Sequence, residues 1–127
     1  MAACENHQQK MIRMDGKLYP CGTSVAMSII GGKWKLVIIH HLRQGKLRYN
    51  ELRKQLPTVT ERTLSLQLKQ LENDGVVSRR VYTKKPPLKV EYELTEFGLT
   101  LLPVLKAIGE WGNKVAQERG EAVPFEV

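Results

Sequence analysis

Residues 48–95 have the sequence RYNELRKQLPTVTERTLSLQLKQLENDGVVSRRVYTKKPPLKVEYELT, in which two helical patterns precede two alternating ones. Asn50 is the predicted N-cap of a helix over 51–56, and Pro57 ends that helix because the residue before a proline is pushed out of helical geometry. A second helix begins at Thr60 and stops at Gly75. Two short helices joined by a turn of about four residues match a helix-turn-helix plan.

The second half of this stretch predicts a basic β hairpin. β-branched and aromatic residues alternate over 76–82 and again over 89–94. The connection 83–88 carries two lysines and two prolines, and the prolines limit its conformational freedom. A hairpin placed directly after a helix-turn-helix predicts an α+β, mainly α, winged helix-turn-helix fold with a two-stranded β wing over about 77–94.

Positive charge is concentrated in this part of the chain. Twenty Lys and Arg stand against thirteen Asp and Glu, a formal net charge of +7. Residues 33–56 account for +6 and residues 78–89 for +5, so the remainder sums to −4. Such localised charge is typical of a surface that binds a phosphate backbone. A solvated basic face is the alternative interpretation of the charge taken alone.

The segments before residue 48 predict further elements. Residues 1–20 are polar and lack clear periodicity, which predicts a flexible N-terminal arm. Helices are expected over 23–30 and 33–43, and a brief strand over 46–49.

After the wing, Thr95 is expected to cap one long helix over about 95–118, bent at Pro103. Its apolar positions cover a wider arc than the single stripe of a surface helix. These positions are Leu101, Leu102, Leu105, Ile108, Trp111 and Val115. So wide an arc favours a second partner, most simply another copy of the chain. Residues 119–127 are predicted to form a C-terminal tail.

On the second helix, Leu64, Leu68 and Leu71 form one apolar stripe, and the opposite face points away from the core. We expect contacts to base edges from, or beside, Thr60, Arg62, Thr63, Ser65, Leu66 and Lys69. We expect contacts to phosphates from Arg48, Lys54, Arg79, Lys84, Lys85 and Lys89. Leu66 suits a thymine methyl group, although single exposed leucines are also ordinary.

Together these segments resemble the HxlR family of bacterial winged-helix regulators, which is related to MarR-type repressors. The resemblance covers about 21–112 and is carried by the ordered set IIGGKW, RYNEL, RTLSLQLKQLENDG, PP-x-x-VEYELTEFG and EWG. It implies a homodimer built from N- and C-terminal dimerisation helices, which binds a palindromic operator in double-stranded DNA as repressor or activator. It also implies that 60–73 is the recognition helix and 83–88 the wing tip, within a domain over 21–115.

The chain has two cysteines, Cys4 and Cys21, which are expected to be thiols in a reducing compartment. In several members of the family a cysteine just before the first helix senses electrophiles or oxidants, and Cys21 stands at the matching position. Gly22 replaces the proline that usually follows this cysteine. Cys21 is therefore a candidate redox sensor, and the alternative is a small buried residue at the dimer interface.

Other classes of function have little support in the sequence. No nucleophile or carboxylate stands at a recognised catalytic spacing from His40 and His41, and no phosphate-binding glycine loop is present, so neither an enzyme nor a cofactor is predicted. Cys4-x-x-His7, with Cys21 or His41, is a weak signal for metal because structural zinc usually takes four ligands in paired spacings. No metal site is predicted.

No apolar run approaches the ~20 residues that cross a bilayer, and the first residues do not resemble a secretion signal. We therefore expect a cytoplasmic protein without a membrane partner. The leading hypothesis is a sequence-specific, dimeric DNA-binding transcriptional regulator. The alternative is a winged-helix protein-interaction or RNA-binding module, since a fold does not determine a function.

Overall fold

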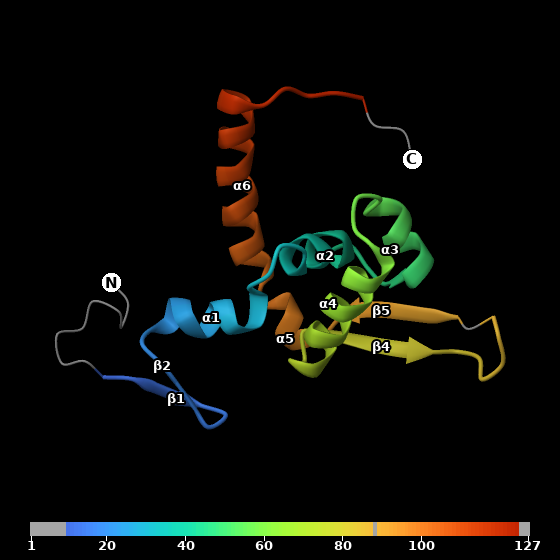
Figure 1. Cartoon of the computed structure of the whole chain (residues 1–127), viewed down its shortest axis with the longest axis horizontal. Coiled ribbons are helices and arrows are strands. Elements are labelled where there is room, and N and C mark those ends of the chain that lie inside the picture. The colour runs from blue at the N-terminus through green and yellow to red at the C-terminus, as the bar shows by residue number, and fades with distance from the viewer. Residues whose placement is uncertain (1–9, 88, 125–127) are drawn as a thin grey trace. The chain divides into compact units, whose positions relative to one another are not determined.

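The computed structural model describes residues 10–87 and 89–124 (Figure 1). The chain forms two compact units, Met1–Lys33 and Trp34–Val127, and each is described by itself. Among the described residues, no single helix is both long and apolar enough to cross a membrane, and the helices Gly22–Ile30 and Lys35–Leu42 meet this requirement only when their lengths and compositions are taken together.

The described residues of the first unit form a hairpin and one helix. Strands β1 (Ile12–Met14) and β2 (Lys17–Tyr19) pair antiparallel, and helix α1 spans Gly22–Ile30. Asp15 and Gly16 connect the strands with φ angles of 50° and 76°, a conformation for which an Asp-Gly pair is well suited. A hairpin therefore lies within the predicted flexible arm of residues 1–20, and three-residue strands were too short to show an alternation in the sequence. Residues 1–9 of that arm lie outside the described part.

The described residues of the second unit form five helices and a small antiparallel sheet. The helices are α2 (Lys35–Leu42), α3 (Tyr49–Gln55), α4 (Glu61–Asn73), α5 (Glu96–Leu99) and α6 (Leu102–Arg119). The strands are β3 (Leu47–Arg48), β4 (Val77–Val81) and β5 (Val90–Leu94), in the order β3-β5-β4. The helix-turn-helix and the wing are thus confirmed, and the predicted brief strand adds a third strand to the two-stranded wing.

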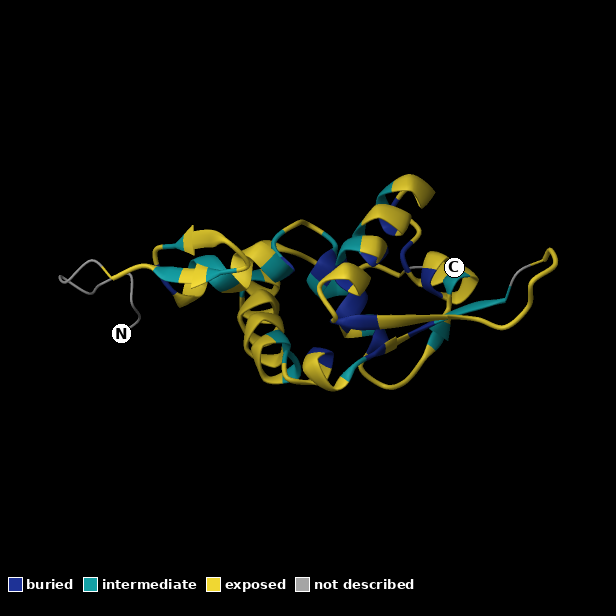
Figure 2. Cartoon of the chain, turned by 90° about the horizontal axis from the view of Figure 1, so that it is seen from below, coloured by how far each residue is buried: buried dark blue, intermediate teal, exposed yellow. Residues whose placement is uncertain are grey.

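The core of this unit lies between α2, α3, α4 and the sheet. Leu64, Leu68 and Leu71 of α4 are at most 1% exposed, which confirms the predicted leucine stripe. They pack in a core with Ile38, Ile39, Leu42, Leu52, Val76, Val77 and Tyr92. Figure 2 shows the buried positions gathered on the inner sides of the helices and on the strands. Each buried leucine contributes about 1.5–3 kcal/mol, so burial determines which side of α4 faces outward.

The starts of α3 and α4 are capped differently. The predicted N-cap of α3, Asn50, is wrong, because the helix begins two residues earlier, at Tyr49, with Arg48 as N-cap. The backbone amide of Arg48 donates to the Glu51 carboxylate at 2.9 Å. The second helix was predicted to begin at Thr60; it begins one residue later, at Glu61, and Thr60 is its N-cap, whose Oγ1 accepts from the backbone amide of Thr63 at 3.1 Å.

The predicted single helix over 95–118 is wrong, because the chain forms α5 and then α6. Thr95 Oγ1 accepts from the Gly98 amide at 3.0 Å, which caps α5. A helix continued from α5 would bring the ring of Pro103 against the carbonyl of Leu99. Pro103 instead lies in the first turn of α6, where its missing N–H costs no hydrogen bond and causes no bend.

α5 packs closely on the start of β4 at Gly98. Gly98 is buried, and a Cβ added there would clash with the carbonyl oxygen of Val76. The same carbonyl accepts from the backbone amide of Thr95 at 3.1 Å, so α5 and this backbone cannot easily move apart. The close approach requires glycine.

We therefore expect Gly98→Ala to lower the free energy of unfolding by about 1–3 kcal/mol, the usual cost of overpacking. Urea denaturation monitored by circular dichroism measures this change. Gly109→Ala is the matched control, since an added Cβ there meets no described atom within 4 Å and alanine should favour α6 by about 0.5–1 kcal/mol. Equal urea concentrations at the midpoint of unfolding for the two variants would contradict the close packing at Gly98.

Candidate nucleic-acid interface

The outer face of α4 is exposed along its length. Arg62, Leu66 and Lys69 are exposed on the side opposite the buried leucines, as the helical periodicity predicts. Leu66 keeps 52% of its surface exposed although it is apolar. This face can therefore contact a partner without any rearrangement of the core.

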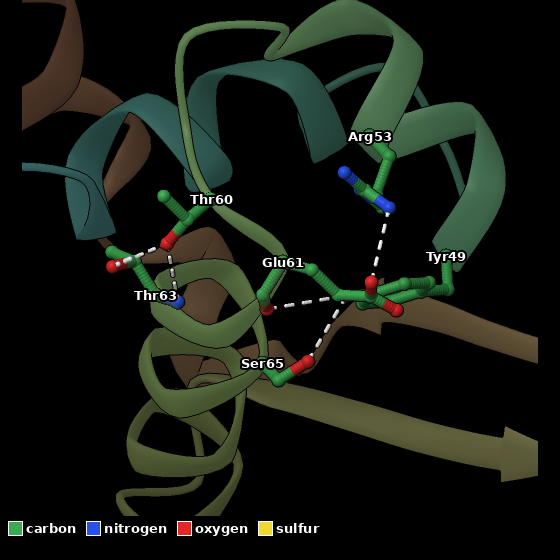
Figure 3. Close-up of polar contacts among 6 residues, drawn as sticks. All are labelled: Tyr49, Arg53, Thr60, Glu61, Thr63 and Ser65. Carbon is green, nitrogen blue, oxygen red and sulfur yellow. Dashed lines mark hydrogen bonds and ion pairs between the residues drawn. The ribbon is translucent and has the colours of Figure 1, made fainter.

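Polar contacts attach α3 to the first turns of α4 (Figure 3). Tyr49 Oη donates to the backbone carbonyl of Glu61 at 3.3 Å and lies 3.0 Å from Ser65 Oγ. Arg53 Nη1 lies 3.3 Å from Glu61 Oε2, an ion pair whose side chains are largely exposed. Exposed ion pairs contribute only about 0–1 kcal/mol, so these contacts mainly set the position of α4 beside α3.

An open cleft of about 470 Å³ lies beside α4. It is lined by Arg48, Tyr49, Asn50, Glu61, Ser65, Arg79, Pro87, Lys89, Val90 and Tyr92. Four of these residues were predicted to contact DNA, and they come from β3, α4, β4 and the end of the wing loop. Three cations line the cleft against one carboxylate, that of Glu61, which is already paired with Arg53. The cleft therefore has a net positive charge and suits a phosphate group.

Tyr92 connects this cleft to the core. Burial raises the pKa of its phenol, and the hydrogen bond to Arg79 opposes this rise. Tyr92 therefore remains a protonated phenol at neutral pH, so it adds no negative charge to the cleft. Register places Arg79 directly opposite Tyr92 in the β4–β5 pair, so the sheet determines the position of Arg79.

Positive charge also surrounds Glu91 on β5, the central strand of the sheet. Glu91, next to Tyr92 on β5, has a lowered pKa because Tyr82 donates a hydrogen bond to it and because Lys46, Lys89 and Arg48 lie nearby. This carboxylate is therefore ionised at neutral pH and offsets part of the positive charge of these neighbours.

The wing loop is closed by its own side chains. Thr83 Oγ1 donates to the Pro87 carbonyl at 3.2 Å and accepts from the Lys89 amide at 3.3 Å. The Lys89 ammonium also lies 5.0 Å from the centroid of the Tyr82 ring. Lys84 and Lys85 are exposed at the tip, whereas Leu88 lies outside the described residues.

Some of the predicted residues lie elsewhere. Lys54 is exposed near the end of α3 and does not line the cleft. The hydroxyls of Thr60 and Thr63 are bonded to each other at 2.9 Å, so both take part in capping α4. Lys35, which the charge count placed in the basic region, is only 7% exposed and belongs to the core.

The lining residues that the sequence did not predict include Tyr49, Asn50 and Tyr92. Tyr49 and Asn50 lie where a helix start was predicted, and Tyr92 occupies an ordinary strand position. No local pattern distinguishes a tyrosine that supports a neighbouring helix from one that fills a core. Their role depends on the packing of α3, α4 and the sheet.

Cys21 is buried and disulfide-bonded in the first unit, so the expectation of a thiol is wrong for this residue. Cys4 and His7, the residues considered for a metal site, lie outside the described part of the chain. Within residues 10–87 and 89–124, no three His, Cys, Asp or Glu side chains form a group that could hold a metal ion.

Comparisons with known proteins agree with this geometry. Residues 29–120 match the family model described as HxlR-like helix-turn-helix. The chain is 53% identical over 94 residues to YdeP of Bacillus subtilis, described as an uncharacterized HTH-type transcriptional regulator, which covers 74% of this chain and 73% of that protein. The structure of the redox regulator HypR in its oxidized form is 45% identical with a TM-score of 0.69, covering 81% of this chain and 100% of HypR. The reduced form of the transcriptional regulator YodB from B. subtilis is 34% identical with a TM-score of 0.62, and the match covers 74% of this chain and 92% of YodB.

Proposed function

Because the chain belongs to the HxlR-like helix-turn-helix family and is a DNA-binding transcriptional regulator, we propose that it binds a palindromic operator as a homodimer. In this proposal α4 is the recognition helix and the β4–β5 wing contacts the backbone. The observation that carries the assignment is the positive cleft directly beside the exposed face of α4. A helix that enters the major groove brings its flanks close to phosphates, and the cleft places cations on that flank.

The two kinds of contact are assigned by position. Arg62, Leu66 and Lys69 project from the outer face of α4 and are assigned to base edges, with Ser65, Thr60 and Thr63 beside them. The backbone contacts are assigned to Arg48, Lys54, Arg79, Lys84, Lys85 and Lys89. Phosphate contacts position the protein on any duplex, whereas base contacts distinguish sequences.

The exposed apolar face of α6 supports the dimer. None of the residues of α6, all of which are described, is buried. Val104, Ile108 and Trp111 are exposed at helical spacing, and Trp111 has 70% of its surface exposed. Contiguous apolar surface of this kind is typical of an interface. A two-fold dimer places its half-sites about one helical turn apart, roughly 34 Å.

Base and phosphate contacts should respond differently to substitution. We expect Arg62→Ala to weaken binding to the operator by about 1–3 kcal/mol and to relax preference at one position of each half-site. Lys84→Ala with Lys85→Ala should weaken binding to all duplexes and flatten the salt dependence, because fewer counterions are released. Binding titrations at several salt concentrations, on operator and scrambled duplexes, measure both effects.

An unchanged salt slope in the lysine variant would count against the wing assignment. If no duplex is selected from a random pool and the wild-type protein binds RNA or a protein instead, the chain is an RNA-binding or protein-interaction module. Selection from a random pool also identifies the half-site.

The dimer depends on apolar contacts of α6. We expect Trp111→Glu to weaken self-association at least about tenfold, since an interfacial tryptophan often contributes 2 kcal/mol or more. Sedimentation equilibrium measures the association constant. Gln117→Glu adds the same charge on the opposite side of α6 and should leave the constant unchanged. A wild-type protein that is monomeric at all concentrations would refute the dimer.

Redox control is a second function, favoured by the disulfide at Cys21 and by the likeness to a redox regulator. We propose that reduction of this disulfide changes operator affinity. Titrations with and without dithiothreitol should differ for the wild-type protein and coincide for Cys21→Ser. Met27→Leu, which removes an exposed sulfur of α1, should behave as the wild type. Identical wild-type curves would exclude redox control through Cys21.

A further inference from the structure

The hydroxyl of Ser65 is not free to turn. Tyr49 Oη contacts both the Glu61 carbonyl at 3.3 Å and Ser65 Oγ at 3.0 Å (Figure 3). A carbonyl oxygen can only accept a hydrogen bond, so a bond to Glu61 uses the single proton of the phenol. The shorter contact then needs a proton from Ser65. Either hydroxyl could be the donor in the bond at 3.0 Å, and Ser65 is the donor when Tyr49 donates to Glu61.

This direction limits what Ser65 can offer a partner. A serine hydroxyl has one proton and two lone pairs, so a free hydroxyl can donate or accept and distinguishes bases poorly. Once its proton is held by Tyr49, the exposed Ser65 Oγ presents only lone pairs to the outside. In the major groove, only the amino groups of adenine and cytosine donate hydrogen bonds.

We propose that Tyr49 holds the proton of Ser65 and thereby makes Ser65 a specificity-determining residue, which accepts a hydrogen bond from adenine or cytosine at one position of each half-site. The inference rests on the proposed role of α4 as the recognition helix. Tyr49 is a positioning residue that does not contact the base. The Arg53–Glu61 ion pair supports this role of Tyr49. It holds the first turn of α4, whose Glu61 carbonyl accepts the proton of Tyr49 in this proposal.

Operator selection from random duplexes tests the proposal with three proteins. The wild type should restrict one half-site position to adenine or cytosine. Ser65→Ala should relax that position alone. Tyr49→Phe should release the Ser65 hydroxyl, which can then donate as well, so that guanine and thymine become acceptable at the same position. The expected discrimination is about three- to tenfold, as for one net hydrogen bond.

A base analogue tests the same contact without relying on Tyr49→Phe folding correctly. Purine in place of adenine, or 2-pyrimidinone in place of cytosine, removes only the amino group at that position. The wild type should lose about three- to tenfold in affinity for the modified operator, and Ser65→Ala should bind both operators equally. An equal loss for the two proteins would overturn the proposal.

Tyr19→Phe is the matched control, because it removes a tyrosine hydroxyl in the first unit and should leave the selected operator unchanged. If Ser65→Ala keeps the wild-type preference at every position, the proposal is wrong. It is also wrong if Tyr49→Phe reduces preference equally at all positions, since Tyr49 would then act only as a structural support. Failure of the proposed function differs from both outcomes, because the wild type would then select no duplex.

Discussion

The burial of Leu64, Leu68 and Leu71 is the interaction on which the rest of the second unit depends. These side chains hold α4 in the core with α2 and the sheet, and they leave its opposite face exposed. A rotation of α4 about its axis would expose them at a cost of about 1.5–3 kcal/mol each, far more than any surface contact could return. The outward direction of Arg62, Leu66 and Lys69 is thus a consequence of apolar packing.

Polar contacts determine the position of α4 more closely than this packing does. Burial determines which face of α4 is exposed, whereas the bonds from Tyr49 and Arg53 determine how its first turns lie against α3. Hydrogen bonds have direction, and apolar contacts do not. A hydroxyl held by a directed bond presents a defined acceptor, and the proposed discrimination between bases rests on this directed bond.

The close approach at Gly98 has a comparable effect on the C-terminal part of the chain. Bonds from Thr95 to the backbone of Gly75 and Val76 hold α5 against the start of β4, and the break before Pro103 then starts a new helix. α6 consequently leaves the core with all of its described side chains at least partly exposed. The apolar face available for the proposed dimer is therefore a result of where α5 ends.

The sequence alone determined that α4 lies between Thr60 and Gly75, and it determined the leucine stripe and the wing strands, because caps, glycine conformations and periodicities are local signals. The same signals were insufficient for the hairpin at Asp15-Gly16 and for the break that makes α5 and α6. Only the tertiary structure decided that Arg48, Ser65, Arg79 and Lys89 share one cleft, and that Lys35 is buried. These features join residues that are distant in the chain, and their physical cause is packing and sheet register, which no local pattern encodes.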